Sequence, residues 1–357
     1  MTRVAHAPEA SIGVVANPVS ARDIRRIVAN AGNLQITDRV NIVLRLLSAA
    51  ASCGVKRAWI MPDRGGIRSL LERHLRRGTD HSLPAIEFLD MQPTSTVEDT
   101  FTATRLLQRM GVSAIVVLGG DGTHRAVARQ LADDNSAVPI AGLSTGTNNA
   151  FPEMREPTIT GMAVGLFASG RIARAQALAP NKMIEVRIDD AHAGTRRDIA
   201  IVDAAITHDR SVGARALWKI HSLDAVYLAF ADPQAIGLSA IGGLLQPVGR
   251  LESGGLAVQL AHGGREALLT LHAPIAPGMV RPVDIASWQR MVAGEALPVL
   301  AQAGTVALDG ERELGFERGQ RVQMTLRENA FFTVDVARCM GFAANARLLR
   351  FTSSLNH

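Results

Sequence analysis

A glycine-rich stretch with one carboxylate and one hydroxyl is the clearest candidate for chemistry in the chain: Gly119, Gly120, Asp121, Gly122 and Thr123. It follows an apolar run at 114–118, rich in β-branched residues, of the type that is buried on both faces of a parallel sheet. Glycines allow a positive φ and a close approach to a phosphate, and Thr123 can cap a helix expected over 124–131. The pattern predicts a turn where helix amides bind phosphate beside the Asp121 carboxylate.

The same stretch also fits a plain strand-to-helix turn, in which the glycines serve packing and Asp121 caps the helix. A phosphate site is favoured if other polar groups follow neighbouring strands, because open α/β sheets bind ligands at the carboxyl ends of their strands. Polar residues follow two further apolar runs: Asn17, Ser20 and Arg22 after the first, and Thr147 and Asn149 after the run at 137–143. These residues offer hydroxyl, amide and guanidinium groups to a ligand.

The first half of the chain alternates apolar runs with segments of helical periodicity. Expected strands lie at 11–17, 57–62, 85–90, 114–118 and 137–143, and expected helices at 38–51, 66–77, 94–110 and 124–131. Strands separated by single helices predict βαβ units with right-handed crossovers and an open, mostly parallel sheet. We therefore expect a Rossmann-like α/β nucleotide-binding domain over 11–165.

The alternation of strand and helix segments ends at a linker expected over 157–179. Short runs predict strands at 183–188, 199–207, 255–261, 267–272, 304–308, 321–326 and 331–336, with helices at 214–231 and 285–291. Short strands joined by turns are typical of an antiparallel β domain, which we expect over 178–336 as the substrate domain. The segment 337–357 predicts a helix over 337–349 and a tail that can return to the first domain.

The amino-acid composition excludes several classes of protein function. The chain has 357 residues, 47% of them hydrophobic, and its net charge of +5 comes from scattered arginines with only 4% aromatic residues. That distribution does not predict a nucleic-acid surface, although it favours anionic substrates. The cysteines, Cys53 and Cys339, lie far apart and predict neither a disulfide nor a metal site. The apolar stretch 225–249 is interrupted, and 1–11 lacks a signal-type core, so we expect a cytoplasmic protein without a membrane span.

The polar segments resemble three motifs of the superfamily that contains NAD kinases, diacylglycerol kinases and sphingosine kinases. Residues 119–123 match its Gly-Gly-Asp-Gly-Thr signature, and 17–23 is similar to its Asn-Pro-x-Ser phosphate loop, with Ala21 in place of a glycine. Residues 144–152 resemble its Gly-Thr-x-Asn motif, with Ala150 in place of an acidic residue. The resemblance implies that an α/β domain and an antiparallel β domain enclose an active site between them.

Three segments of the expected β domain resemble family elements as well. Residues 236–247, including Ser239, are similar to the Ser-Leu-Ser-Ala-Gly-Gly stretch of NAD kinases. Residues 201–206 resemble their adenosine-binding strand, with Val202 in place of its Asn and a carboxylate kept at Asp203. The Asp-Gly element of the superfamily corresponds to Asp309, Gly310 and Glu311, which also read as a tight hairpin turn.

Over its whole length the chain resembles the acetoin-catabolism protein X family, an NAD-kinase-like group. The stretches that carry this resemblance lie at 17–26, 119–125, 144–152 and 212–218. It implies an ATP-dependent kinase with ATP and Mg²⁺ as cofactors and NAD as the phosphoryl acceptor, in an enzyme linked to acetoin catabolism. Relatives in this superfamily are commonly dimers or tetramers, so a homo-oligomer is expected.

The resemblance implies roles for the candidate residues. Asp121 would accept the proton of the attacking hydroxyl, and seven residues would bind nucleotide phosphates: Asn17, Ser20, Arg22, Gly119, Gly120, Gly122 and Thr123. The substrate would contact Thr147, Asn149, Asp203 and Ser239, with Asp309 or Glu311 as a second acidic group. Two alternatives stay open, namely a kinase of another polyol or lipid-like acceptor, and a sensor that binds NAD or ATP without catalysis.

Overall fold

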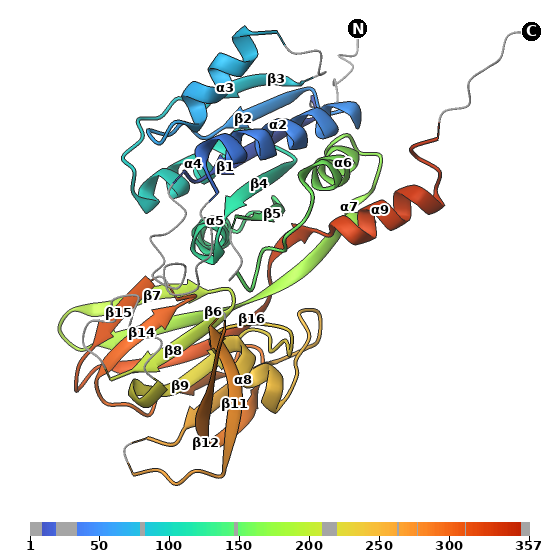
Figure 1. The fold of residues 1–357 in the computed structure, drawn as a ribbon. Helices are drawn as coiled ribbons and strands as arrows, with labels where there is room; N and C mark the ends of the chain where they lie inside the picture. The colour runs from blue at the N-terminus through green and yellow to red at the C-terminus, as the bar shows by residue number, and fades with distance from the viewer. Residues whose placement is uncertain are drawn as a thin grey trace, which may run out of the picture.

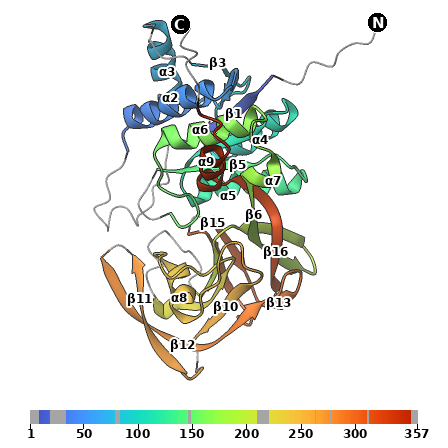
Figure 2. The ribbon, with the colours of Figure 1, turned by 90° about the vertical axis from the view of Figure 1, so that its right-hand side faces the viewer.

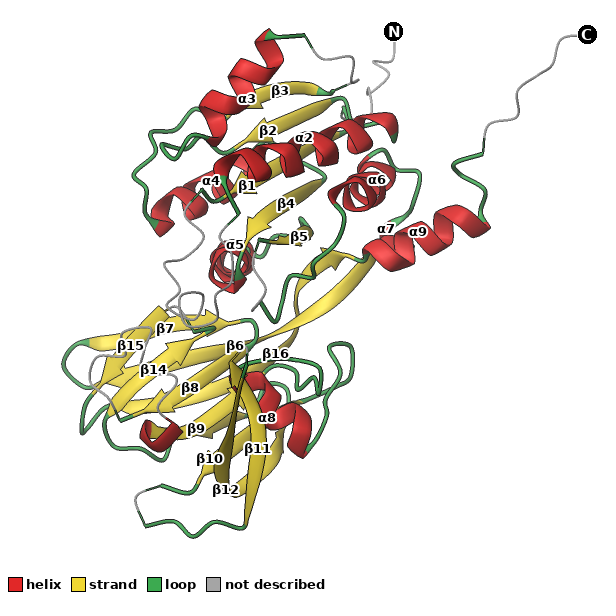
Figure 3. Cartoon of the chain, in the orientation of Figure 1, coloured by secondary structure: helices red, strands yellow, loops and turns green. Residues whose placement is uncertain are grey.

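A computed structural model describes residues 9–18, 34–78, 83–145, 149–208, 220–262, 264–276, 278–310 and 312–350. The chain forms two lobes, an α/β lobe that carries most of the helices and a second lobe that consists mainly of strands (Figures 1 and 3). This arrangement confirms the expected fold class, an open and mostly parallel sheet followed by an antiparallel β domain.

The first lobe is built on five parallel strands in the order β3-β2-β1-β4-β5. Their bounds are β1 Ser11–Ala16, β2 Arg57–Ile60, β3 Ala85–Phe88, β4 Ala114–Gly119 and β5 Ile140–Ser144. The helices between them are α2 Ile36–Ser52, α3 Ile67–Arg76, α4 Val97–Arg109 and α5 Asp121–Asp133. Alternate residues of β4 face opposite layers: Ile115 packs in the core that contains α4 and α5, and Val116 in the core that contains α2. The sheet is therefore covered on both faces, as its apolar strands require.

Two long strands extend this sheet toward the second lobe (Figure 1). Strand β16 (Arg321–Val334) pairs in parallel with β5 at Thr333 and Ile140, and antiparallel with β6 (Leu178–Asp190) along most of its length. Strands β7 (Gly194–Ala200) and β13 (Ala296–Pro298) complete a sheet of nine strands among the described residues. The two lobes thus share one continuous sheet.

The second lobe contains a seven-stranded antiparallel sheet, counted over the described residues, in the order β11-β12-β10-β9-β8-β14-β15. Its strands are β8 Asp203–Thr207, β9 Leu223–Leu228, β10 Gly255–Leu260, β11 Leu269–Ala276, β12 Met279–Met291, β14 Gly304–Leu308 and β15 Arg312–Phe316. Helix α8 (Leu238–Leu245) covers it, and Ile241 lies in the same core as Val226 and Val258.

Several predicted elements differ from the structure. The helix expected over 214–231 is wrong where it is described, since a 3₁₀ turn at Ile220–Ser222 leads into strand β9. The helix expected over 285–291 is the end of strand β12, whose alternating burial places Val283 and Ile285 in the core. The strand expected over 199–207 is interrupted at 201–202, and the strands at 321–326 and 331–336 are one strand with a register shift between Arg327 and Phe331.

The segment expected as a linker, 157–179, contains α6 (Pro157–Ala168) and α7 (Arg174–Ala177). Helix α6 packs closely on α2, where Gly161 and Gly165 leave room for the α2 backbone. The last helix, α9 (Val336–Asn345), packs against α6 and α7 beside the first lobe (Figure 2). The domain limits 11–165, 178–336 and 337–357 stay predictions. None of the helices in the described ranges combines the length and apolar composition needed to cross a membrane.

Candidate functional site

The glycine-rich turn joins β4 directly to α5. Helix α5 begins at Asp121 with Gly120 as its N-cap, so the expected start at His124 and the capping role of Thr123 are wrong. Neither Gly119 nor Gly120 has a positive φ, and Gly120 has a φ of −91°. Gly119 serves packing instead, because a Cβ there would lie 2.7 Å from Thr123 Oγ1. Thr123 Oγ1 also accepts a hydrogen bond from Asn17 Nδ2 at 3.3 Å, which ties the end of β1 to this turn.

Asp121 lies buried in the first turn of α5 and holds the loop that follows β5. Its Oδ2 accepts a hydrogen bond from the N–H of Ala150 at 3.0 Å, and its Oδ1 accepts one from the N–H of Phe151 at 2.9 Å. The Asp121 carboxylate therefore has an anchoring contact that the sequence did not predict. The signature turn and the segment resembling Gly-Thr-x-Asn are joined by these two bonds.

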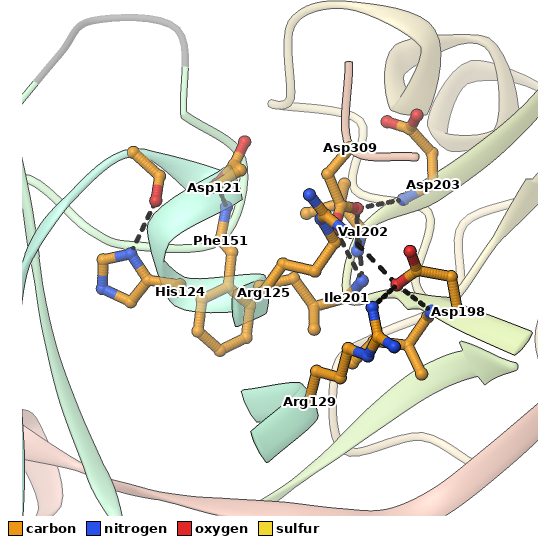
Figure 4. Close-up of polar contacts among 12 residues, drawn as sticks. Asp121, His124, Arg125, Arg129, Phe151, Asp198, Ile201, Val202, Asp203 and Asp309 are labelled. Atoms are coloured by element: carbon orange, nitrogen blue, oxygen red, sulfur yellow. Dashed lines mark hydrogen bonds and ion pairs between the residues drawn. The ribbon is translucent and has the colours of Figure 1, made fainter. Parts of the chain in front are cut away.

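A buried histidine fixes the N-cap of α5. His124 Nδ1 lies 2.8 Å from the carbonyl oxygen of Gly120, and burial lowers the pKa of His124 to about 4 (Figure 4). The imidazole is therefore neutral near pH 7, and since a carbonyl only accepts, the proton resides on Nδ1. Sequence reasoning gave His124 no role beyond the family motif, because its partner is a main-chain atom.

Arginines of α5 reach across to the second lobe. Arg125 Nη1 lies 3.5 Å from Asp198 Oδ1 and Arg125 Nε lies 3.6 Å from Asp309 Oδ2, while Arg129 Nη1 lies 3.1 Å from Asp198 Oδ1 (Figure 4). The side chains of Asp198 and Asp309 are at most 1% exposed. These buried arginine–aspartate contacts join α5 to β7 and to the turn between β14 and β15.

Asp309 occupies the turn between β14 and β15, where Asp309 and Gly310 have φ of 48° and 70°. Its carboxylate accepts hydrogen bonds from the main-chain N–H groups of Ile201, Val202 and Asp203, at the break between β7 and β8. Burial raises the pKa of Asp309 to about 8, although Arg125 acts in the opposite direction. Asp309 is thus a turn residue whose carboxylate is engaged by the protein itself.

A cleft of about 800 Å³ opens at the carboxyl ends of the parallel strands. Of the candidate residues, five line it: Asn17, Gly120, Gly122, Thr123 and Asn149. The residues that line it include Arg64, Arg105 and Arg129 as well as Glu98 and Asp133. The volume lies within the range of about 300–1,000 Å³ that is common for ligand sites. The polar, arginine-bearing wall fits a nucleotide with phosphate groups.

The remaining candidates lie elsewhere or outside the described residues. Asp203 stands at the start of β8, with its carboxylate pointing away from Asp309 (Figure 4), and Ser239 is buried in the first turn of α8. The candidates that fall outside the described residues are Ser20, Arg22, Thr147 and Glu311, together with 212–218. In the described ranges, no group of three or more His, Cys, Asp or Glu is arranged to hold a metal ion. Mg²⁺ commonly takes only one or two carboxylates together with substrate phosphates, and a carboxylate on the cleft wall, such as Glu98 or Asp133, would be its protein ligand.

Known families match both halves of the chain. Residues 13–172 match the family described as ATP-NAD kinase N-terminal domain, and residues 182–329 match the one described as acetoin catabolism protein X C-terminal domain. All residues that line the cleft lie within 13–172, the part of the chain that matches the ATP-NAD kinase N-terminal domain.

The chain belongs to the acetoin catabolism protein X family. It is 58% identical over 341 residues to acetoin catabolism protein X of Cupriavidus necator, a match that covers 95% of this chain and 94% of that protein. The resemblance seen in the sequence is therefore confirmed.

Two solved structures show partial similarity. Yeast NADH kinase complexed with NADH aligns with a TM-score of 0.49 and 11% identity, over 99% of this chain and 91% of that one. A diacylglycerol kinase from Bacillus anthracis str. Sterne aligns with a TM-score of 0.45 and 11% identity, over 91% of this chain and 96% of that one.

Proposed function

We propose that this protein transfers a phosphoryl group from ATP to a hydroxyl of a small molecule, with NAD(H) as the acceptor that becomes NADP(H), in the context of acetoin catabolism. The observation that carries this proposal is the cleft, which places Asn17, Asn149 and the first turn of α5 around one polar volume. The family match of residues 13–172 to an ATP-NAD kinase domain supports the same reaction.

Phosphoryl transfer requires positioning and charge neutralisation more than covalent chemistry. The amides of Gly120, Gly122 and Thr123 lie at the positive end of the α5 dipole and would hold phosphate oxygens. Arg105 and Arg129 on the cleft wall would neutralise further phosphate charge. Mg²⁺, when bound, would supply charge neutralisation between the phosphates.

Asp121 is proposed as the group that receives or orients the proton of the attacking hydroxyl. It lies in the same helical turn as the cleft-lining Gly122. Asn149, which lines the cleft, and Thr147 are proposed contacts to the acceptor. Asp203 and Ser239 are proposed contacts to the NAD ribose or adenine, and because Ser239 is only 1% exposed, its contact requires the first turn of α8 to shift.

The direct test is incubation of the purified protein with Mg²⁺, ATP and NAD or NADH, followed by an enzyme-coupled assay for NADP(H). We expect product with the wild type and a loss of about 10²- to 10⁴-fold in turnover with Asp121→Asn. Calorimetric titration with ADP in parallel should show that the variant still binds nucleotide. Full turnover by Asp121→Asn would remove the proposed role of this carboxylate.

A second candidate function is nucleotide binding without catalysis. It is favoured by one observation, namely that both carboxylate oxygens of Asp121 already accept hydrogen bonds from the chain. Binding of ATP or NAD with no phosphorylated product from NAD, a polyol panel or a lipid-like acceptor would support this sensor. A phosphorylated product from another acceptor would keep the kinase function and replace NAD(H) as the proposed acceptor.

A further inference from the structure

Arg250 contacts the same two residues of the post-β5 loop that Asp121 contacts. Its Nη1 donates a hydrogen bond to the carbonyl of Phe151 at 3.0 Å, and its Nη2 donates one to the carbonyl of Ala150. Asp121 accepts hydrogen bonds from the N–H groups of Ala150 and Phe151. The main chain of these two residues is therefore held on its donor side by α5 and on its acceptor side by the second lobe.

Aromatic rings fix the same contact. The guanidinium of Arg250 lies 5.3 Å from the ring centroid of Phe151 and 4.3 Å from that of Phe230, within the range of a cation–π interaction. The ring of Phe151 also lies 5.6 Å from that of Phe331 on β16 and 5.9 Å from that of His124. Arg250 thus has two planar partners and two hydrogen-bond acceptors, which suit a rigid guanidinium better than a flexible ammonium.

The turn that carries Arg250 is itself anchored. The ammonium group of Lys182 on β6 donates hydrogen bonds to the carbonyls of Gly249, Glu252 and Gly254, at 2.9, 2.8 and 2.7 Å. Arg250 is therefore presented from a turn that is fixed to the long sheet shared by both lobes. A side chain held this way can transmit the position of the second lobe to the loop it contacts.

The loop leads directly into the cleft. Asn149 precedes the two clamped residues, lines the cleft and donates a hydrogen bond from Nδ2 to Ser144 Oγ at 2.8 Å. Fixing the main chain at Ala150 and Phe151 limits the directions in which the Asn149 amide can point. Arg250 does not line the cleft, so any effect on binding must act through this loop.

We propose that Arg250 is a positioning residue that clamps the loop after β5 against Asp121 and so aims Asn149 into the cleft. Ligand binding by the first lobe then depends on the seating of the second lobe. The effect on a ligand rests on the proposed function, whereas the clamp on the loop does not.

The test compares Arg250→Gln and Arg250→Lys with Arg338→Gln as a matched control. Arg338 on α9 also donates hydrogen bonds to main-chain carbonyls, those of Ala175 and Leu178, but far from this loop along the chain. Hydrogen exchange at the amides of Ala150 and Phe151 reports the clamp, and calorimetry with ADP and with NAD reports the cleft. Strand β4 serves as the internal exchange reference.

With Arg250→Gln, exchange at both amides should accelerate about tenfold or more while β4 is unchanged, since hydrogen bonds to a charged group limit local opening. The dissociation constant of NAD or ADP should rise about tenfold. Arg250→Lys should give values between those of the wild type and Arg250→Gln, because lysine keeps the positive charge but lacks the planar pair of guanidinium donors. Arg338→Gln should leave both readouts at wild-type values. If Arg250→Gln does not fold, the exchange rates and ligand affinities of Arg250→Lys are compared with those of the wild type and Arg338→Gln instead.

The proposal is overturned if Arg250→Gln lowers global stability as much as Arg338→Gln does but leaves exchange at Ala150 and Phe151 and ligand affinity unchanged. Arg250 would then be a structural contact only. If the wild type binds ligand but yields no phosphorylated product, the kinase function fails while the clamp stands. If the wild type yields product and the exchange rates do not move, the clamp alone fails.

Discussion

Arg125 on α5 and Asp309 in the β14–β15 turn form an ion pair across the boundary of the two lobes, with 3.6 Å between Nε and Oδ2. Asp309 in turn binds the main chain where β7 gives way to β8. One arginine next to the signature turn therefore connects the candidate site to the start of the β8 strand. Asp203, a proposed substrate contact, lies at that start.

The first prediction concerns this ion pair. Arg125→Ala should lower the free energy of unfolding at pH 7 by about 1–3 kcal/mol, because it removes a buried polar partner of Asp198 and Asp309. The loss stays below the roughly 3–5 kcal/mol of an uncompensated buried charge, because Asp198 keeps Arg129 and burial favours the protonated form of Asp309. Urea denaturation measures the change. Arg45→Ala is the control, since Arg45 pairs with Glu156 at the surface and such pairs contribute about 0–1 kcal/mol. Equal effects of the two substitutions would contradict the structural role of Arg125.

The second prediction is a pH dependence of stability. Burial raises the pKa of Asp309 to about 8, whereas Asp in an unfolded chain titrates near about 3.9. Between these values the native protein binds more protons at this site than the unfolded chain does, so the free energy of unfolding falls as pH rises. From pH 7 to pH 8 the fall from this group amounts to about 1 kcal/mol.

Asp309→Asn should remove that fall, which urea denaturation at pH 7 and pH 8 would measure. Two other groups have shifted pKa values. Burial lowers the pKa of His124 to about 4, so its contribution changes only below about pH 6.5. Burial lowers the pKa of Lys182 to about 8, so the native protein loses protons there in the same window and stability rises with pH by an amount that the wild type and the variant share. The contribution of Asp309 is therefore the difference between the two pH slopes. An identical pH slope in the wild type and the variant would exclude Asp309 as the cause.

The third prediction compares two helix glycines. A Cβ at Gly161 on α6 would overlap the carbonyl oxygen of Leu46 on α2, whereas a Cβ at Gly341 on α9 meets no atom within 4 Å. Gly161→Ala should therefore destabilise the protein by about 1–3 kcal/mol. Gly341→Ala should stabilise it by about 0.5–1 kcal/mol, because alanine is the better helix residue. Thermal unfolding of the two variants checks the opposite signs.

The fourth prediction separates two roles of Asp121. Asp121→Asn keeps one acceptor oxygen but turns an NH₂ group toward an N–H of the loop, so it should cost about 1–3 kcal/mol of stability besides the loss of turnover. Chemical denaturation and steady-state kinetics on the same preparation measure both effects. Unchanged stability with lost turnover would mean that the loop contact is energetically minor and that the carboxylate acts on the substrate alone.

The parallel half of the fold was predictable because its signals are local. Runs such as 114–118 are apolar and β-branched, and each is followed by a periodic helix, so sequence spacing alone predicts the βαβ order. The antiparallel half was harder. Residues 285–291 and 223–228 contain enough apolar residues for either element, and pairing with distant strands makes them β12 and β9. The register shift after Arg327, near Asn329 with its φ of 51°, explains why the sequence pattern predicts two strands where β16 is one.

In the candidate site, too, some features could be predicted from local sequence signals and others could not. The positions of Asn17, Asn149 and the first turn of α5 around one cleft follow from the rule that ligands bind at the carboxyl ends of parallel strands. Arg250 and His124 could not be predicted from the sequence, because their partners are main-chain carbonyls and carry no sequence signal. The anchoring of Asp121 by the loop amides escaped prediction for the same reason.

The position of β16 bears on how the chain is made. Among the described residues it is the last strand along the chain, yet it lies between β5 and β6 in the nine-stranded sheet. A chain emerging from the ribosome can form the β3-β2-β1-β4-β5 order early, but one edge of β5 and one edge of β6 stay unpaired until residues 321–334 have been synthesised. Such long-range pairing slows folding, and open strand edges invite association with other nascent chains. The final assembly of both lobes therefore waits for the synthesis of residues 321–334.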